Sequence, residues 1–97
     1  MARTPIHPGE ILRDELEEIG LSAKRLADVL EVPPNRLYQI LAGKRNITAD
    51  TALRLGQYFG TSAVFWMNLQ GAYELDLARQ QMGKALQRIP QRGKTAA

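Results

Sequence analysis

The stretch "EVPPNRLYQI", Glu31 to Ile40, places two prolines directly before a segment with helical spacing. Proline lacks a backbone N–H and resists helix interiors, so the pair either breaks a helix or marks where one begins. Pro34 pushes the residue before it toward extended geometry, which is the backbone of a helix N-cap. Pro34 itself suits the first helical position, where a missing N–H costs nothing. The pair therefore predicts the start of a short helix that runs through Leu37 to a cap at Gly43.

A second short helix is expected immediately before this one. Ser22 is a good N-cap, and apolar residues at positions 26, 29 and 30 follow it with helical spacing. The connection covers only about residues 31–33, so the two helices are joined by a tight turn. Together with the small Ala27, this spacing matches a helix-turn-helix over residues 23–42. The glycine that usually stands in the turn is absent, and Glu31 occupies its place.

The rest of the chain also reads as helix, with no two-residue alternation of the kind that indicates a strand. The first helix is expected to start at Pro8 and to end at Gly20 as a left-handed cap. A fourth helix opens at Thr48 or Ala49 and stops at Gly60, and a longer fifth helix runs from 61 or 62 to about 82. The fold class is therefore all-α with five helices. Residues 1–82 form one domain and residues 83–97 a basic, flexible tail.

The fifth helix carries two apolar stripes, and a helix that is apolar on two sides needs two partners. One partner is the domain core, and the second is another copy of the chain; the alternative is that both stripes face the core. The first stripe is Trp66, Leu69, Tyr73 and Leu77, and the other is Ala63, Met67, Gly71 and Leu75. The residues predicted to form a dimer interface are Trp66, Met67, Leu69, Tyr73, Leu75 and Leu77.

The composition argues against an enzyme and a bound cofactor. The chain has no cysteine, which excludes disulfides, thiolate metal sites and cysteine nucleophiles. Its one histidine, His7, precedes a proline at a helix start and reads as an N-cap or a surface residue. The carboxylates of residues 14–18 crowd one helix without a basic partner for acid–base catalysis. We therefore expect no catalytic residue, no cofactor and no metal.

The same composition favours the cytoplasm. The longest apolar run, residues 63–67, is far too short to span a bilayer. The first ten residues show no secretion signal, and the absence of cysteine fits a reducing compartment. We expect no membrane partner.

The charge of the chain is unevenly distributed. The net charge is +3 overall, made up of −3 over residues 1–20, +3 over 21–47, −2 over 48–77 and +5 over 78–97. A basic segment that coincides with the helix-turn-helix indicates a surface that faces a polyanion. The alternative is a set of solvated helix faces.

If the helix after the prolines lies in a DNA major groove, its outward residues meet the base edges. Arg36 can donate two hydrogen bonds to guanine, and Asn35 or Gln39 can pair with adenine. Pro34 offers only apolar contact, and Tyr38 lies beside these residues. The expected phosphate contacts, at helix starts and in loops, are Ser22, Lys24, Lys44, Arg45 and Thr48. The alternative for each residue is an exposed polar side chain without a partner.

Three motifs extend the pattern beyond the helix-turn-helix. They are "HPGEIL" (7–12), "LSAKRLADVLEVPPNRLYQILAGKRNITADTALRL" (21–55) and "FGTSAVFWMNLQGAYELDLA" (59–78). Over about residues 5–80 the chain resembles HigA-type antitoxins of the Cro/C1 (XRE) helix-turn-helix superfamily. The resemblance implies a lambda-repressor-like domain that forms a homodimer through its last helix and binds a palindrome in the promoter of its own operon, and so lies with the nucleoid. It also implies a second partner, a RelE-like ribonuclease toxin.

Two other functions stay open at this point. The chain is alternatively a protein-binding inhibitor whose helix-turn-helix is a relic, a reading that Glu31 and the two prolines support. It is alternatively a stand-alone repressor without a toxin. A gel shift with promoter DNA addresses the first alternative, and the identity of the adjacent gene addresses the second.

Overall fold

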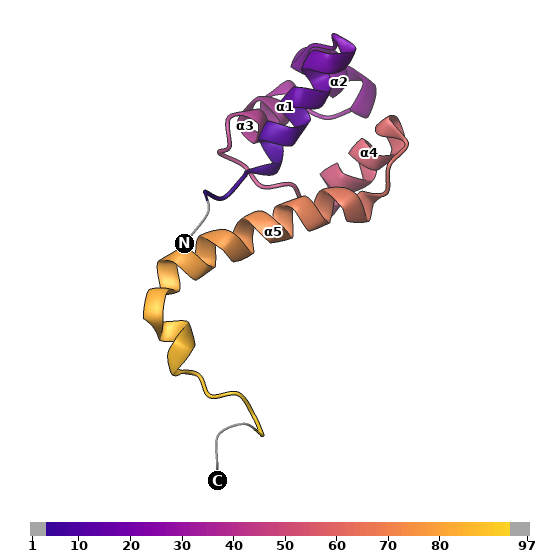
Figure 1. The fold of residues 1–97 in the computed structure, drawn as a ribbon. Coiled ribbons are helices and arrows are strands. Elements are labelled where there is room, and N and C mark those ends of the chain that lie inside the picture. Colours follow the sequence, from indigo (N-terminus) through magenta and orange to yellow (C-terminus); the bar gives the residue numbers. More distant parts are fainter. Residues whose placement is uncertain (1–3, 94–97) are drawn as a thin grey trace.

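The computed structural model describes residues 4–93, which contain five α-helices and one 3₁₀-helix and no strand. The elements are α1 (Pro8–Ile19), α2 (Ala23–Leu30), α3 (Pro34–Leu41), α4 (Ala49–Phe59), α5 (Ala63–Met82) and the 3₁₀-helix η1 (Gly83–Arg88). Helices α1 to α4 form a compact group, and α5 runs along one side of it (Figure 1). The all-α, five-helix fold expected from the sequence is confirmed.

Side-chain caps set most of the helix starts. Ser22 Oγ accepts a hydrogen bond of 3.1 Å from the backbone N–H of Arg25 and caps α2. Ser62 Oγ does the same for α5 through the N–H of Phe65, also at 3.1 Å. Gly20 ends α1 in the left-handed conformation, with φ of 69°. These caps satisfy backbone groups that have no partner inside the helix.

The two prolines lie at the start of α3, as predicted. Pro33 is the N-cap, with an extended backbone at φ −60° and ψ 136°, and Pro34 is the first helical residue. Glu31 adopts the left-handed conformation at φ 59°, as no other non-glycine residue does in the described chain. The turn therefore keeps the backbone that a glycine usually supplies, at a conformational cost of about 1 kcal/mol. The predicted cap at Gly43 is confirmed: two residues after Leu41, the last residue of α3, Gly43 has φ of 75° and donates its N–H to the carbonyl oxygen of Ile40 at 3.0 Å.

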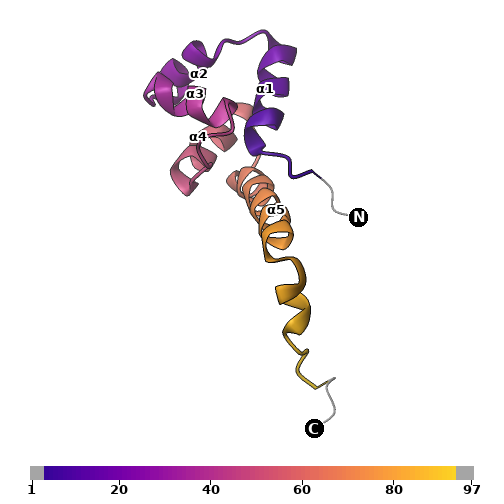
Figure 2. The same ribbon diagram turned by 90° about the vertical axis from the view of Figure 1, so that its left-hand side faces the viewer.

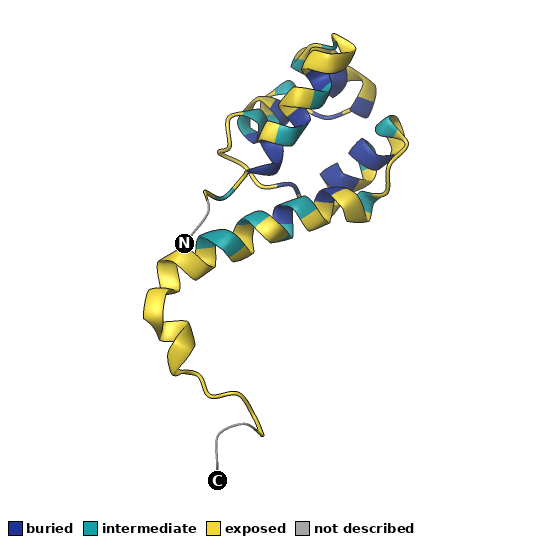
Figure 3. Cartoon of the chain, in the orientation of Figure 1, coloured by how far each residue is buried: buried dark blue, intermediate teal, exposed yellow. Residues whose placement is uncertain are grey.

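The core lies where α1 to α5 meet. Its fully buried members come from each of the five α-helices and from the loop before α4, and they are among the residues that Figure 3 colours dark blue as buried. They include Leu12, Leu26, Leu37, Ile40, Ile47, Leu55 and Trp66. One core therefore joins α2 and α3 to the helices on both sides of them, which fixes the angle of the helix-turn-helix.

The C-terminal part of the chain projects away from this core. The radius of gyration is 17.1 Å, whereas a compact chain of this length has about 12.5 Å. Residues 78–93 are all exposed, and Figures 2 and 3 show them extending beyond the helical group. The predicted tail, residues 83–97, begins with η1, and residues 94–97 lie outside the described residues. The end of α5 thus has little cover from its own chain.

Candidate nucleic-acid interface

Helix α3 has one face in the core and the other toward solvent. Leu37 and Ile40 are fully buried, whereas Asn35 and Tyr38 are exposed. Three other residues predicted to face DNA are half-buried: Pro34, Arg36 and Gln39. The residues predicted to contact bases therefore lie on or next to the solvent side of α3, and the opposite side anchors the helix in the core.

The N-terminal end of α1 packs directly against the last turn of α3. At Gly9, a Cβ atom would lie 2.0 Å from the carbonyl oxygen of Ile40, so no side chain fits there. Arg13 donates from Nη2 to the carbonyl oxygen of Leu41 at 2.7 Å. This contact satisfies one of the carbonyl groups left over at the end of α3. Helix α1 thus fixes the position of α3 through backbone contacts.

His7 secures the same junction from the other side. Its Nδ1 accepts a 2.9 Å hydrogen bond from the N–H of Gly9, and the Glu10 carboxylate accepts one from the N–H of His7. The imidazole is only 6% exposed, and its ring lies edge-on to Tyr73 of α5 at a centroid distance of 4.9 Å. The predicted N-cap role is confirmed, and the alternative of a surface residue is wrong. "HPGEIL" is therefore a motif that joins α1, α3 and α5.

The burial of His7 makes stability depend on pH. Burial lowers the pKa of His7 below its usual 6.5, against the opposing effects of the Arg45 carbonyl and the Glu10 carboxylate. The unfolded chain then binds more protons than the folded chain as the pH falls below 6.5, so acid favours unfolding. We expect the melting temperature to fall between pH 7.5 and 5.5. His7→Asn, which keeps a capping side chain without titrating, should flatten this profile, and an unchanged profile would contradict the assignment.

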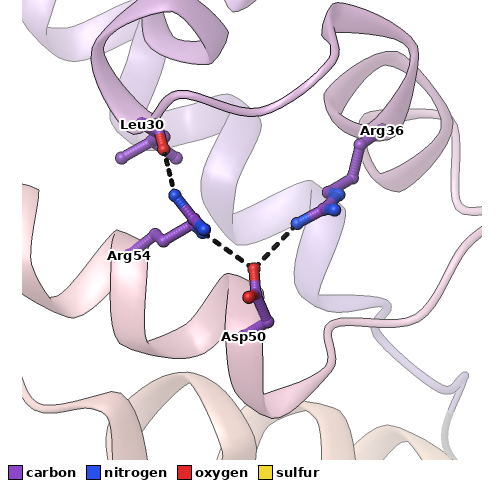
Figure 4. A network of polar contacts seen from close by, with 4 residues as sticks. All are labelled: Leu30, Arg36, Asp50 and Arg54. Carbon is purple, nitrogen blue, oxygen red and sulfur yellow. Dashed lines mark hydrogen bonds and ion pairs between the residues drawn. The ribbon is translucent and has the colours of Figure 1, made fainter.

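Arg36 is part of a network that the sequence reasoning missed. Its Nη1 donates to Asp50 Oδ1 at 2.9 Å, and Arg54 Nε donates to the same oxygen at 2.8 Å. Arg54 Nη1 also donates to the carbonyl oxygen of Leu30 at 2.8 Å, so the network reaches the end of α2 (Figure 4). The hydrogen bonds from Arg54 and Arg36 hold the pKa of Asp50 below its usual value. The carboxylate therefore stays ionised beside the solvent face of α3.

The predicted phosphate contacts are exposed in two groups. One group is the start of α2, where Ser22 is the N-cap and Lys24 forms a 3.7 Å ion pair with Asp28. The other group follows α3 and consists of Lys44, Arg45 and Thr48. Arg45 Nη1 lies 3.4 Å from Gln39 Oε1, which connects this loop to α3. Thr48 is the N-cap of α4 but makes no side-chain capping bond.

The residues of α5 predicted to form the dimer interface differ in how far they are buried within the chain. Trp66 is 1% exposed, and its indole N–H donates to Thr61 Oγ1 at 3.1 Å. Its assignment to the dimer interface is wrong, because the side chain is buried in the core of its own chain. The helical period alone does not tell which stripe of α5 faces the core. Leu69, Tyr73 and Leu77 are half-buried within the chain. Met67 and Leu75 are 39% and 57% exposed and are open to a second copy.

Gln70 is a further structural residue that the sequence analysis did not single out. It is 2% exposed, and its Oε1 accepts a 2.8 Å hydrogen bond from the N–H of Ile47. Its Nε2 donates to the Glu74 carboxylate, also at 2.8 Å. The amide thus fixes the loop between α3 and α4 to α5. A buried glutamine has no signal in a single sequence except its place between apolar residues.

Within residues 4–93, no three acidic or histidine side chains gather closely enough to hold a metal ion. The helices of this part are also too short or too polar to cross a membrane.

Comparison with known proteins agrees with this arrangement. The helix-turn-helix family profile matches residues 12–66. Virulence-associated protein I of Dichelobacter nodosus is 57% identical over 76 residues, which are 77% of this chain and 70% of that protein.

Solved structures show the same fold over nearly the whole chain. An addiction module antidote protein of the HigA family from Coxiella burnetii has a TM-score of 0.88 and 49% identity, covering 92% of this chain and 98% of that one. Pseudomonas aeruginosa antitoxin HigA with the higBA promoter has a TM-score of 0.85 and 48% identity, with the same coverage. The chain belongs to the helix-turn-helix family and, within it, to the HigA-type antitoxins.

Proposed function

We propose that the chain is a sequence-specific DNA-binding antitoxin that, as a homodimer, represses its own operon in the cytoplasm. The observation that carries this proposal is the placement of α3. Its inner residues Leu37 and Ile40 are fully buried, and the outer surface around Asn35, Arg36 and Tyr38 is left for a ligand. A helix held in this way fits the major groove, which admits an α-helix.

The charges around α3 support a nucleic-acid ligand. Residues 21–47 carry a net charge of +3, and Lys44 and Arg45 in the loop after α3 are exposed. Lysine and arginine at such positions neutralise DNA phosphates. The similar HigA of P. aeruginosa was solved with the higBA promoter, and the similar antitoxin GraA was solved with its operator. These complexes favour DNA over the alternative of a protein-binding inhibitor with a relic helix-turn-helix.

The exposed apolar residues of α5 favour a homodimer. Met67 and Leu75 are well exposed, as are Met82 at the end of α5 and Leu86 in η1. Pairing α5 with its copy would cover such residues. Two recognition helices related by a two-fold axis would then lie about 34 Å apart and read a palindrome. Sedimentation of the full chain should give a dimer, and Leu75→Asp should shift it toward the monomer.

The second proposed partner is a RelE-like ribonuclease toxin, whose activity the antitoxin blocks. The support for this partner is the relationship to HigA-family antidote proteins. Co-purification with the product of the adjacent gene tests it, because a toxin bound by this chain is recovered with it. If no toxin gene is adjacent and nothing co-purifies, the protein is a repressor that acts alone.

The assignment of Arg36 as a base-reading residue gives a direct test. Arg36→Ala should weaken binding to the promoter palindrome by about 1–3 kcal/mol, about 5- to 150-fold, and relax the preference at one base pair of each half-site. Fluorescence anisotropy with specific and scrambled duplexes measures both effects. Lys44→Ala is the control, because loss of a phosphate contact weakens both duplexes alike. If Arg36→Ala binds the palindrome as tightly as the wild type, Arg36 does not read a base.

A further inference from the structure

An acidic side chain lies within the surface proposed to bind DNA. Asp50 is in the first turn of α4, two residues after the predicted phosphate contact Thr48, and its side chain is 56% exposed. A carboxylate at this position repels the phosphate backbone. Its hydrogen bonds to Arg36 and Arg54 suggest a benefit that offsets this repulsion.

We propose that Asp50 is a positioning residue that orients Arg36 for base readout and lowers the affinity for non-specific DNA. Asp50 thereby sets the specificity ratio, which is the affinity for the palindrome divided by the affinity for non-specific DNA. The inference rests on the proposed function, since it needs Arg36 to read a base.

The first half of the argument is geometric. Arg54 donates one hydrogen bond to the carbonyl oxygen of Leu30 and another, from Nε at 2.8 Å, to Asp50 Oδ1. The same Asp50 oxygen accepts a hydrogen bond from Arg36 Nη1 at 2.9 Å. This series of hydrogen bonds runs from the end of α2 through α4 to α3, as Figure 4 shows. The flexible Arg36 side chain is therefore restrained before DNA arrives, so less conformational freedom is lost on binding.

The restrained guanidinium can still read a base. Arginine has five N–H donors in a planar fork, and within the described residues Arg36 uses its side chain for the Asp50 bond alone. Two further donors are enough for a bidentate contact to O6 and N7 of guanine. Asp50 and a guanine base can thus bind opposite parts of the same guanidinium.

The second half of the argument is electrostatic. Arg36, Asp50 and Arg54 together carry a net charge of +1, and an asparagine at position 50 would raise it to +2. Non-specific binding comes almost entirely from the attraction between basic residues and phosphates. Asp50 therefore weakens binding to any DNA, whereas the oriented Arg36 recovers affinity only where a guanine is correctly placed.

The test compares Asp50→Asn with Asp14→Asn, an equal change of charge at an exposed position of α1. Asp50→Asn should tighten binding to a scrambled duplex about 3- to 10-fold and reduce the ratio of specific to non-specific affinity about tenfold or more. Its plot of log affinity against log salt should become steeper by about one to two units per dimer. Asp14→Asn should leave the ratio unchanged.

Asp50→Glu separates charge from position. It keeps the carboxylate but moves it, so the salt dependence should stay at the wild-type value while binding to the palindrome weakens. In an Arg36→Ala background, Asp50→Asn should no longer change the preference at the guanine position. These readouts distinguish positioning from a loss of folding, which would weaken binding to both duplexes.

Two results would overturn the inference, and they are distinguishable. If Arg36→Ala leaves binding to the palindrome unchanged, the proposed readout fails and the inference fails with it. If Arg36→Ala weakens specific binding but Asp50→Asn behaves like Asp14→Asn, the proposed function stands and the role of Asp50 is wrong.

Discussion

Trp66→Ala is expected to lower the free energy of unfolding by about 3–5 kcal/mol, as for large aromatic residues in other cores. The side chain is 1% exposed, contacts the rings of Phe59 and Phe65, and donates its indole N–H to Thr61. Alanine would leave a large cavity between α4 and α5. Urea unfolding followed by circular dichroism at two protein concentrations measures the loss.

Met67→Ala is the matched control for Trp66→Ala and tests whether Trp66 lies in the core or at the dimer interface. Met67 is the next residue of α5, but it is 39% exposed and lies on the predicted dimer face. Its loss should act through dimerisation, so its effect should depend on protein concentration, whereas the loss from Trp66→Ala should not. If Trp66→Ala has a small effect that depends on protein concentration, Trp66 belongs to the dimer interface and not to the core.

Gly9→Ala is expected to destabilise the fold by about 3 kcal/mol, near the upper end for overpacked positions. The new methyl group would lie 2.0 Å from the carbonyl oxygen of Ile40 and 2.9 Å from its carbon. Both are backbone atoms, so α1 and α3 must move apart to accommodate it. We expect a lower melting temperature and, because α3 shifts, weaker binding to the palindrome at temperatures where the variant is folded.

Gly20→Ala, at the opposite end of α1, separates this clash from the general effect of replacing glycine. A Cβ at Gly20 meets no atom within 4 Å, but the residue has φ of 69°. The expected loss is about 1 kcal/mol, from backbone strain alone. If the two variants lose equal stability, the close contact between α1 and Ile40 is not what requires glycine at position 9.

Local signals in the sequence were sufficient to predict the helix boundaries. Pro8, Gly20 and Ser22 each act on the backbone within a few residues. The structure places Pro8 at the start of α1, Gly20 at its C-cap and Ser22 at the N-cap of α2, as predicted. The proline pair likewise marks the start of α3, because the conformation of Pro33 depends on its neighbour. The end of α3 was predicted in the same way, because Gly43 adopts a φ of 75° and lets its own N–H and that of Lys44 bond to the carbonyl oxygens of Ile40 and Gln39.

Contacts between distant residues were not predictable in the same way. Arg36 and Asp50 are 14 positions apart, and Ile47 and Gln70 are 23 apart. Their pairing depends on how α3, α4 and α5 pack. Asp50 and Arg54 have the spacing of an i, i+4 ion pair, which would have indicated that pair but not its link to α3.

The orientation of α5 was likewise not predictable from its sequence. The helical period identifies both apolar stripes but not which of them faces the core. The structure resolves the point, because Trp66 is buried while Leu75, on the other stripe, is 57% exposed.

The central claim, that the outer side of α3 reads base edges, is tested most directly by changing single atoms of the DNA. Each guanine of the promoter palindrome is replaced in turn by 7-deazaguanine, which lacks the N7 acceptor, and binding of wild-type and Arg36→Ala protein is measured. One position in each half-site should weaken wild-type binding by about 1 kcal/mol and leave Arg36→Ala unaffected. If every substitution affects the two proteins equally, α3 does not read the palindrome through Arg36.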